Sequence, residues 1–116
     1  MSLEFSAAVR APEVGFLSHL AKFFPNAAPV RIYAQLTRLD GPGAGLTEAV
    51  VIEYGTATEI LFASSSPWEF ADRLQLRNRD GSLDVQASVV AVQYQNGKTA
   101  VAARFSREVP NWIVKP

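Results

Sequence analysis

The sequence predicts a mainly β fold, a closed barrel of six antiparallel strands preceded by one α-helix. Apolar and polar residues alternate over several short runs, which is typical of strands that are buried on one face. Asp80-Gly81 and Asn96-Gly97 separate such runs, and these dipeptides favour tight hairpin turns. No segment between the runs is long enough for the helical crossovers that parallel strands require. Short antiparallel connections of this kind favour a small barrel.

Residues 1–28 are predicted to form an N-terminal extension with an amphipathic helix over about residues 13–24, and residues 29–116 to form the barrel. Pro12 precedes the helix, and Pro25 ends it because proline cannot continue the hydrogen-bond ladder. Five large apolar side chains gather on one face of this helix: Phe16, Leu17, Leu20, Phe23 and Phe24. Such a face either packs across the mouth of its own barrel or docks into a partner protein or a second protomer.

The first three strands are expected over Val30–Thr37, Glu48–Tyr54 and Thr58–Ala63. A loop rich in glycine, residues 40–45, connects the first two. Gly55 interrupts the alternation after the second strand, which indicates a bulge or a tight turn. The inward positions of the first strand are its even-numbered apolar residues: Val30, Ile32, Ala34 and Leu36.

The last three strands are expected over Arg73–Arg77, Leu83–Tyr94 and Thr99–Phe105. In the long middle one, apolar residues are odd-numbered up to Val89 and even-numbered from Val90. This change of phase predicts a bulge or a strong bend, which barrels need in order to close. Four aromatic side chains near the strand ends are expected to plug and cap the barrel, with stacking on bases as the less favoured alternative: Trp68, Phe70, Tyr94 and Trp112.

The composition of the 116 residues is that of one globular domain. Hydrophobic residues make up 48% and charged residues 19%, which is ordinary globular composition, and a domain of this size can bury a core without disulfides. Eleven basic side chains balance eleven acidic ones, so a nucleic-acid polymer is not an expected partner. The chain has no cysteine, which excludes disulfides, thiol catalysis and the usual zinc fingers.

The expected location is the cytoplasm, without membrane insertion. No apolar run approaches the ~20 residues that cross a bilayer, and no basic region followed by an apolar block marks a secretion signal. On the predicted helix, His19 and Lys22 provide too little positive charge for a helix that lies on a membrane surface.

No residue pattern points to catalysis. His19 is the single histidine, and no carboxylate lies three or four residues from it on the helix, so no metal site is expected. The chain also lacks a nucleophile elbow, and its glycine-rich loop lacks the lysine of a phosphate-binding loop. We therefore expect neither an enzyme nor a bound cofactor.

Six pieces follow one another over residues 29–116 in a recognisable order. They are Pro29-Val30, Tyr54-Gly55, Pro67-Trp68 leading to Asp72–Leu76, the strand Val85–Tyr94, the closing strand Gly97–Phe105 and the tail Pro110–Pro116. This order resembles a PilZ domain, a small six-stranded barrel. PilZ domains are bacterial receptors for cyclic diguanylate, a second messenger with two phosphates and two guanines, so the resemblance implies a role in bacterial signalling.

The ligand signature of that family is altered in this chain. Its first part, R-x-x-x-R before the first strand, supplies guanidinium groups for phosphates and guanines. The corresponding segment here, Ala21–Pro29, contains no arginine. The second part, [DN]-x-S-x-x-G at a strand turn, aligns with Glu53, Gly55 and Thr58, which differ from it at all three positions. The resemblance therefore implies a degenerate site, and cyclic diguanylate is not an expected ligand.

Two functions remain open. The leading interpretation is a PilZ-like protein-interaction or regulatory module that does not bind cyclic diguanylate and whose partner is another protein or a second copy of the chain. The alternative is a cyclic diguanylate receptor with a rewired site, in which Arg10, Arg31 or Arg38 contacts the phosphates.

Overall fold

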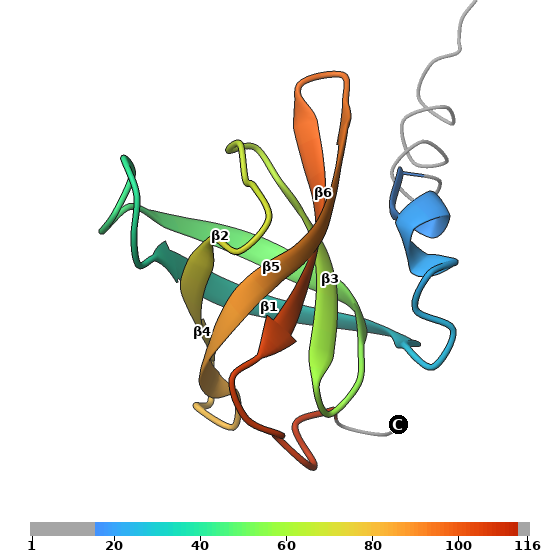
Figure 1. Cartoon of the computed structure of the whole chain (residues 1–116). Coiled ribbons are helices and arrows are strands. Elements are labelled where there is room, and N and C mark those ends of the chain that lie inside the picture. The colour runs from blue at the N-terminus through green and yellow to red at the C-terminus, as the bar shows by residue number, and fades with distance from the viewer. Residues whose placement is uncertain (1–15, 114–116) are drawn as a thin grey trace, which may run out of the picture.

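The structure is a computed structural model that describes residues 16–113. Within that part of the chain it is a closed barrel of six antiparallel strands with one short helix before them (Figure 1). The strands are β1 (Ala28–Arg38), β2 (Thr47–Gly55), β3 (Glu59–Ser64), β4 (Arg73–Asn78), β5 (Asp84–Gln95) and β6 (Lys98–Phe105). The predicted fold class is confirmed, and each strand lies within a few residues of its predicted run.

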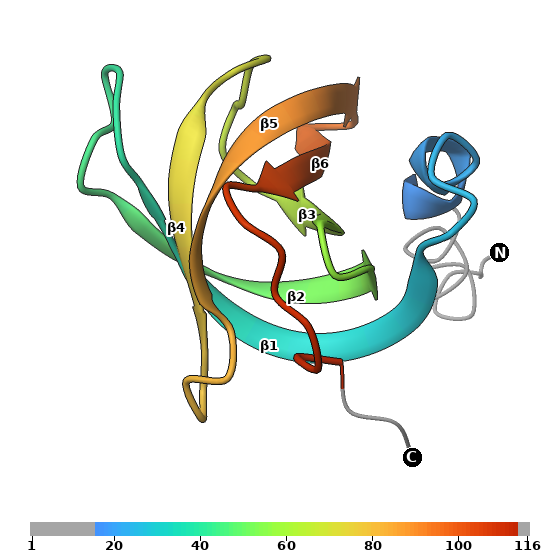
Figure 2. The ribbon, with the colours of Figure 1, turned by 60° about the horizontal axis from the view of Figure 1, so that its bottom comes forward.

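The barrel consists of two three-stranded meanders that are joined edge to edge. Its strand order is β1-β2-β3-β6-β5-β4, and β4 pairs with β1 to close it. The loop of residues 65–72 carries the chain from the first meander to the second and passes one end of the barrel (Figure 1). Figure 2 shows how the strands curve around a common interior.

Both predicted irregularities are present. In β5 the register against β6 shifts between Val89 and Ala91, where the apolar phase changes in the sequence. Val89 faces the barrel interior, whereas Ala91 packs on the outside of the wall. In β2 the register against β3 shifts between Ile52 and Tyr54, just before Gly55. Such bulges bend their strands, which helps a sheet of this size to close.

The interior core receives side chains from all six strands. As predicted, Ala34 and Leu36 of β1 are buried there, while Val30 and Ile32 are partly buried. Burial of an aliphatic or aromatic side chain contributes about 1.5–3 kcal/mol relative to its exposure. The largest fully buried interior side chains include Phe62, Trp68, Trp112, Leu36, Ile52, Ile60, Leu74, Leu76 and Leu83.

A second, smaller core lies on the outside of the barrel, under the helix of residues 16–21. It is formed by Leu17 and Leu20 of the helix with Leu61 of β3 and Ala100 and Ala102 of β6. The helix therefore covers the outer wall of the barrel. The expectation that it packs across the barrel mouth is wrong. The small alanines leave room for leucine side chains on the wall, whereas tryptophans already fill the barrel ends.

The helix ends earlier than predicted. Residue 21 is its last helical residue, and the N–H groups of Phe23 and Phe24 donate to the carbonyls three residues before them at 3.1 and 2.9 Å. Such bonds tighten the last turn of a helix. Residues 13–15 of the predicted helix lie outside the described residues.

Candidate functional site

One end of the barrel is closed by Trp112, which is 1% exposed. Its indole N–H donates to the carbonyl of Thr56 at 2.7 Å, and its ring meets Phe105 edge-on at 5.8 Å between centroids. The ring also lies directly over Gly55: a Cβ at that position would stand 2.6 Å from two ring carbons. Gly55 is therefore required by the close approach of the tryptophan.

The turn after Gly55 uses its own polar groups. The hydroxyl of Thr56 accepts hydrogen bonds from the N–H groups of Thr58 and Glu59 at 3.0 and 2.9 Å. Glu53, the remaining candidate of the altered motif, is half-buried in β2. The three aligned positions thus lie near one another along the chain, but the structure covers the middle one with Trp112.

The opposite end of the barrel is closed by Trp68, which is also 1% exposed. The Arg38 guanidinium stacks 3.8 Å from the centroid of the Trp68 ring. It also donates to Asp72 at 3.2 Å and to the carbonyl of Pro67. On the other side, a Cβ at Gly43 would stand 2.9 Å from Cδ of Arg38. Arg38 is therefore enclosed between Trp68 and the 41–46 loop.

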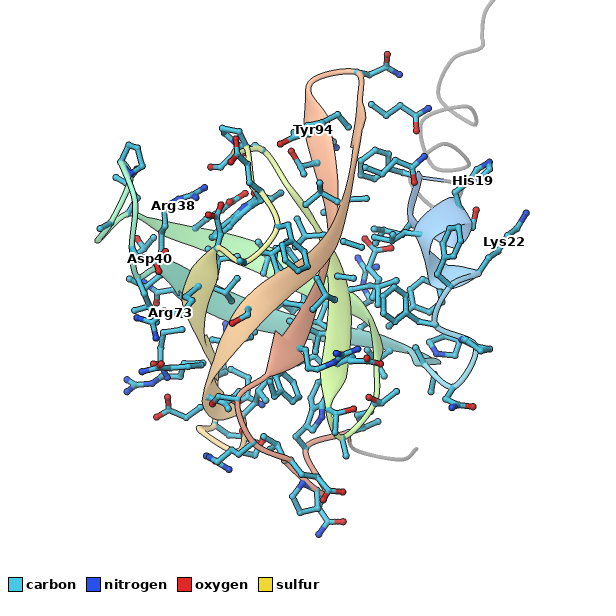
Figure 3. The ribbon with its side chains drawn as sticks, viewed as in Figure 1. His19, Lys22, Arg38, Asp40, Arg73 and Tyr94 are labelled. Carbon is cyan, nitrogen blue, oxygen red and sulfur yellow. The ribbon has the colours of Figure 1, made fainter. Side chains whose placement is uncertain are left out.

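A cavity of about 440 Å³ lies beside this cluster, between the 41–46 loop and the 65–72 loop. Three carboxylates line it, and two of them are engaged: Glu48 accepts from the hydroxyl of Ser64 at 2.7 Å and from the N–H of Ser65 at 2.9 Å, and Asp72 binds Arg38, whereas Glu69 is exposed. These bonds hold the loop against the barrel end. Figure 3 labels Arg38 with the exposed pair Asp40 and Arg73 on this side of the molecule, and Tyr94 on the β5–β6 hairpin.

The candidate arginines are not brought together. Arg31 is exposed in the first half of β1, and Arg38 is the last residue of the same strand. Seven residues of extended chain separate them by about 23 Å. Arg10 lies outside the described residues.

A groove of about 1090 Å³ runs beside the first half of β1. The turn between β4 and β5 forms its other side with Arg79 and Asp80, and Trp112 and Ile113 line it as well. A hydrogen bond from the N–H of Ser82 lowers the pKa of the Asp80 carboxyl. The sequence predicts this turn but not its position beside β1, because the pairing of β4 with β1 is a long-range contact.

The apolar helix stripe is divided between the barrel and the solvent. Leu17 and Leu20 are buried against the wall, Phe16 and Phe24 are half-buried, and Phe23 is 77% exposed. Contact of these residues with another molecule stays a prediction.

Polar groups of the helix point outward. Figure 3 shows His19 and Lys22 on the side of the helix that faces away from the barrel. Across residues 16–113, no group of three or more histidine or acidic side chains could hold a metal ion. The same residues form no helix that is long and apolar enough to cross a membrane.

The predicted aromatic plugs are confirmed for Trp68 and Trp112. Phe70 and Tyr94 are 74% and 58% exposed, so the expectation that they plug the barrel is wrong. Phe70 lies in the loop over the barrel end, where Trp68 already occupies the space. The hydroxyl of Tyr94 instead donates to the carbonyl of Trp68 from outside.

Comparison with known proteins adds no relative. No protein-family model matches the chain, and no curated protein does. The resemblance to PilZ domains therefore rests on the residues and their order.

Proposed function

We propose that this chain is a PilZ-like regulatory barrel that acts through protein contacts and does not bind cyclic diguanylate. The observation that carries the proposal is the position of Trp112. Its indole covers Gly55, at the strand turn where the ligand cradle of the family would lie, and its N–H occupies the carbonyl of Thr56. A dinucleotide at this turn would have to displace a buried aromatic plug.

The arginines support the same proposal. Two phosphates require cations that converge on them, and guanidinium groups do so when their N–H groups are free to fork onto oxygens. The guanidinium of Arg38 already donates to Asp72 and to the carbonyl of Pro67, and it stacks on the ring of Trp68. Arg31 lies toward the other end of the strand, so the two cannot share one ligand phosphate.

A strand edge supports the protein-contact half of the proposal. Within residues 16–113, the first half of β1 has a neighbouring strand on one side, because β4 pairs only with Ala34–Arg38. Edges of this kind present backbone groups that bind extended segments of other chains.

The test is isothermal titration of the full-length chain with cyclic diguanylate. We expect no heat beyond that of dilution at ligand concentrations up to about 100 µM, a range that reveals micromolar binding. A saturable signal with a micromolar dissociation constant would overturn the proposal.

Variants then distinguish specific binding of cyclic diguanylate from an unspecific heat signal. If heat appears, Arg10→Ala, Arg31→Ala and Arg38→Lys are titrated beside Lys98→Ala, which removes an exposed cation at the β5–β6 turn. Loss of binding in an arginine variant but not in Lys98→Ala would favour the rewired receptor. Circular dichroism of each variant confirms that it is folded.

A further inference from the structure

The first half of β1 has a neighbouring strand on only one side within residues 16–113. β1 has 11 residues, and β2 pairs with both of its ends, but on the other side the β4 ladder stops at the pair Ala34–Asn78. Among residues 16–113, no strand therefore pairs with Ala28–Tyr33 on that side. At about 3.3 Å per residue, this edge is roughly 20 Å long.

At least one backbone donor of this edge points toward the groove. The N–H of Leu39 donates to the backbone carbonyl of Arg73 at 3.0 Å, on the β4 side of β1. Alternate residues of an antiparallel strand share one direction, so the series from Leu39 back along β1 reaches Tyr33. Tyr33 lies just beyond the last β1–β4 pair, and its N–H therefore faces the place of an added strand.

The floor of the groove is apolar. Val30, Ile32 and Ile113 are only partly buried against the barrel core, and Trp112 continues the floor between them and the barrel end. Side chains on one face of an added strand would cover these groups and remove them from water, which is favourable.

The charges of the groove favour an acidic occupant. Arg31 lies on one side and Arg79 on the other, and neither has an ion pair with any residue from 16 to 113. The carboxylate of Asp80 also lines the groove, but it accepts the N–H of Ser82 at 2.9 Å. The two arginines thus outnumber the one lining carboxylate.

The same charges disfavour a second copy of this chain. Antiparallel pairing of two β1 edges would bring the two Arg31 side chains within about two residues of each other across the ladder. Like charges at that position are destabilising, and charged edge residues are a common means of preventing self-association.

We propose that Ala28–Tyr33 and the groove beside it bind an extended, acidic segment of a partner protein as an added strand. This inference rests on the proposed function as a protein-interaction module and names the partner chemistry of that module. Pro29 has no N–H, and the register of β1 against β2 shifts between Pro29 and Ile32. The added strand is therefore anchored at the Arg31–Tyr33 end of the edge, beside Arg79.

The test uses a defined peptide and the full-length chain labelled with ¹⁵N. The probe is a capped peptide of alternating valine and glutamate. One control peptide has lysine in place of every glutamate, and a second has N-methyl groups on alternate backbone nitrogens, which removes the donors of one edge. We expect the acidic peptide to shift the amide signals of Arg31, Ile32 and Tyr33 in a saturable manner, and both controls to lose this effect.

Three variants locate the charge dependence. Arg31→Glu and Arg79→Glu are each expected to weaken binding about tenfold, since rim and partner charges then repel. Lys98→Glu makes the same change of charge at the β5–β6 turn, away from the groove, and is expected to leave the dissociation constant unchanged.

Several results would overturn the inference. They are no shift at about 1 mM peptide, shifts confined to the helix or the 65–72 loop, equal binding of either control peptide, or a dimer held by β1 in light scattering. Any of these leaves the proposed function intact if cyclic diguanylate also fails to bind. A positive dinucleotide titration removes the proposed function whatever the peptide does, so the two failures are distinguishable.

Discussion

Trp112→Ala is expected to lower the free energy of unfolding by about 3–5 kcal/mol, the range for removal of a large buried aromatic side chain. Trp112 is 1% exposed, packs edge-on against Phe105 and donates to the carbonyl of Thr56. Its loss leaves a cavity at the barrel end and an unpaired carbonyl. Urea unfolding followed by circular dichroism measures the effect.

Gly55→Ala tests the same contact from its other side. The new Cβ would stand 2.6 Å from the Trp112 ring, so we expect a loss of about 1–3 kcal/mol from overpacking. The φ of Gly55 is not among the positive values, so its backbone tolerates alanine. In the Trp112→Ala background, the same substitution is therefore expected to cost less than about 0.5 kcal/mol.

Gly97→Ala is the matched control. Gly97 has a φ of 80° and no atom within 4 Å of a built Cβ, so alanine there costs free energy through backbone strain alone. That cost should be equal with and without Trp112. A Gly55→Ala cost that is also equal in both backgrounds would contradict the close approach. If Trp112→Ala does not fold, Trp112→Leu provides a smaller apolar plug for the same comparison.

The sequence was informative wherever the signal is local. The Asp80-Gly81 and Asn96-Gly97 dipeptides predicted two hairpin turns, and both glycines have positive φ in the structure. The change of apolar phase at Val89 predicted the β5 bulge. These features depend on the conformational range of glycine and on the two-residue period of a strand, which neighbouring residues determine.

The position of the helix on the barrel wall has a signal in the sequence of β6. Residues 100–103 of β6 are an uninterrupted apolar run, and all four are buried. Such a run is typical of a strand covered on both faces. It could have placed the helix on the outer wall of β6, because the barrel interior can cover only one face of that strand.

The site contacts could not be predicted in this way. Trp112 and Thr56 are 56 residues apart, and Arg38 and Asp72 are 34 residues apart. Each pair meets because barrel closure brings their elements together, and no local period records that. The unpaired edge of β1 could not be predicted either, because it depends on the residue at which β4 stops pairing with β1.

Arg38→Met is expected to destabilise the barrel by about 2–4 kcal/mol, because it leaves partners behind at a largely enclosed site. The side chain of Arg38 is 13% exposed and that of Asp72 is 26% exposed. Methionine fills a similar volume but leaves the carboxylate of Asp72 and the carbonyl of Pro67 without the guanidinium. Urea unfolding measures the loss.

Two further variants separate charge from shape at this position. Arg38→Lys keeps the charge but loses the planar fork and the stacking on Trp68, so about 1–2 kcal/mol should still be lost. Arg73→Lys is the control, because the Arg73–Asp40 pair has a similar separation of 3.2 Å but is about half exposed on both sides. Exposed pairs contribute about 0–1 kcal/mol, so that substitution should be nearly neutral.

The double variant Arg38→Met with Asp72→Asn tests whether the cost of losing Arg38 comes from the charge of Asp72. If the cost of Arg38→Met comes from a stranded carboxylate, neutralising Asp72 should recover part of it, and the two substitutions should not add. Strict additivity would show instead that Arg38 stabilises the barrel end through its stacking on Trp68 and its contact with Gly43. If Arg38→Lys proves as harmless as Arg73→Lys, the guanidinium is not what holds the 65–72 loop, and the bonds of Glu48 to Ser64 and Ser65 become the principal restraint.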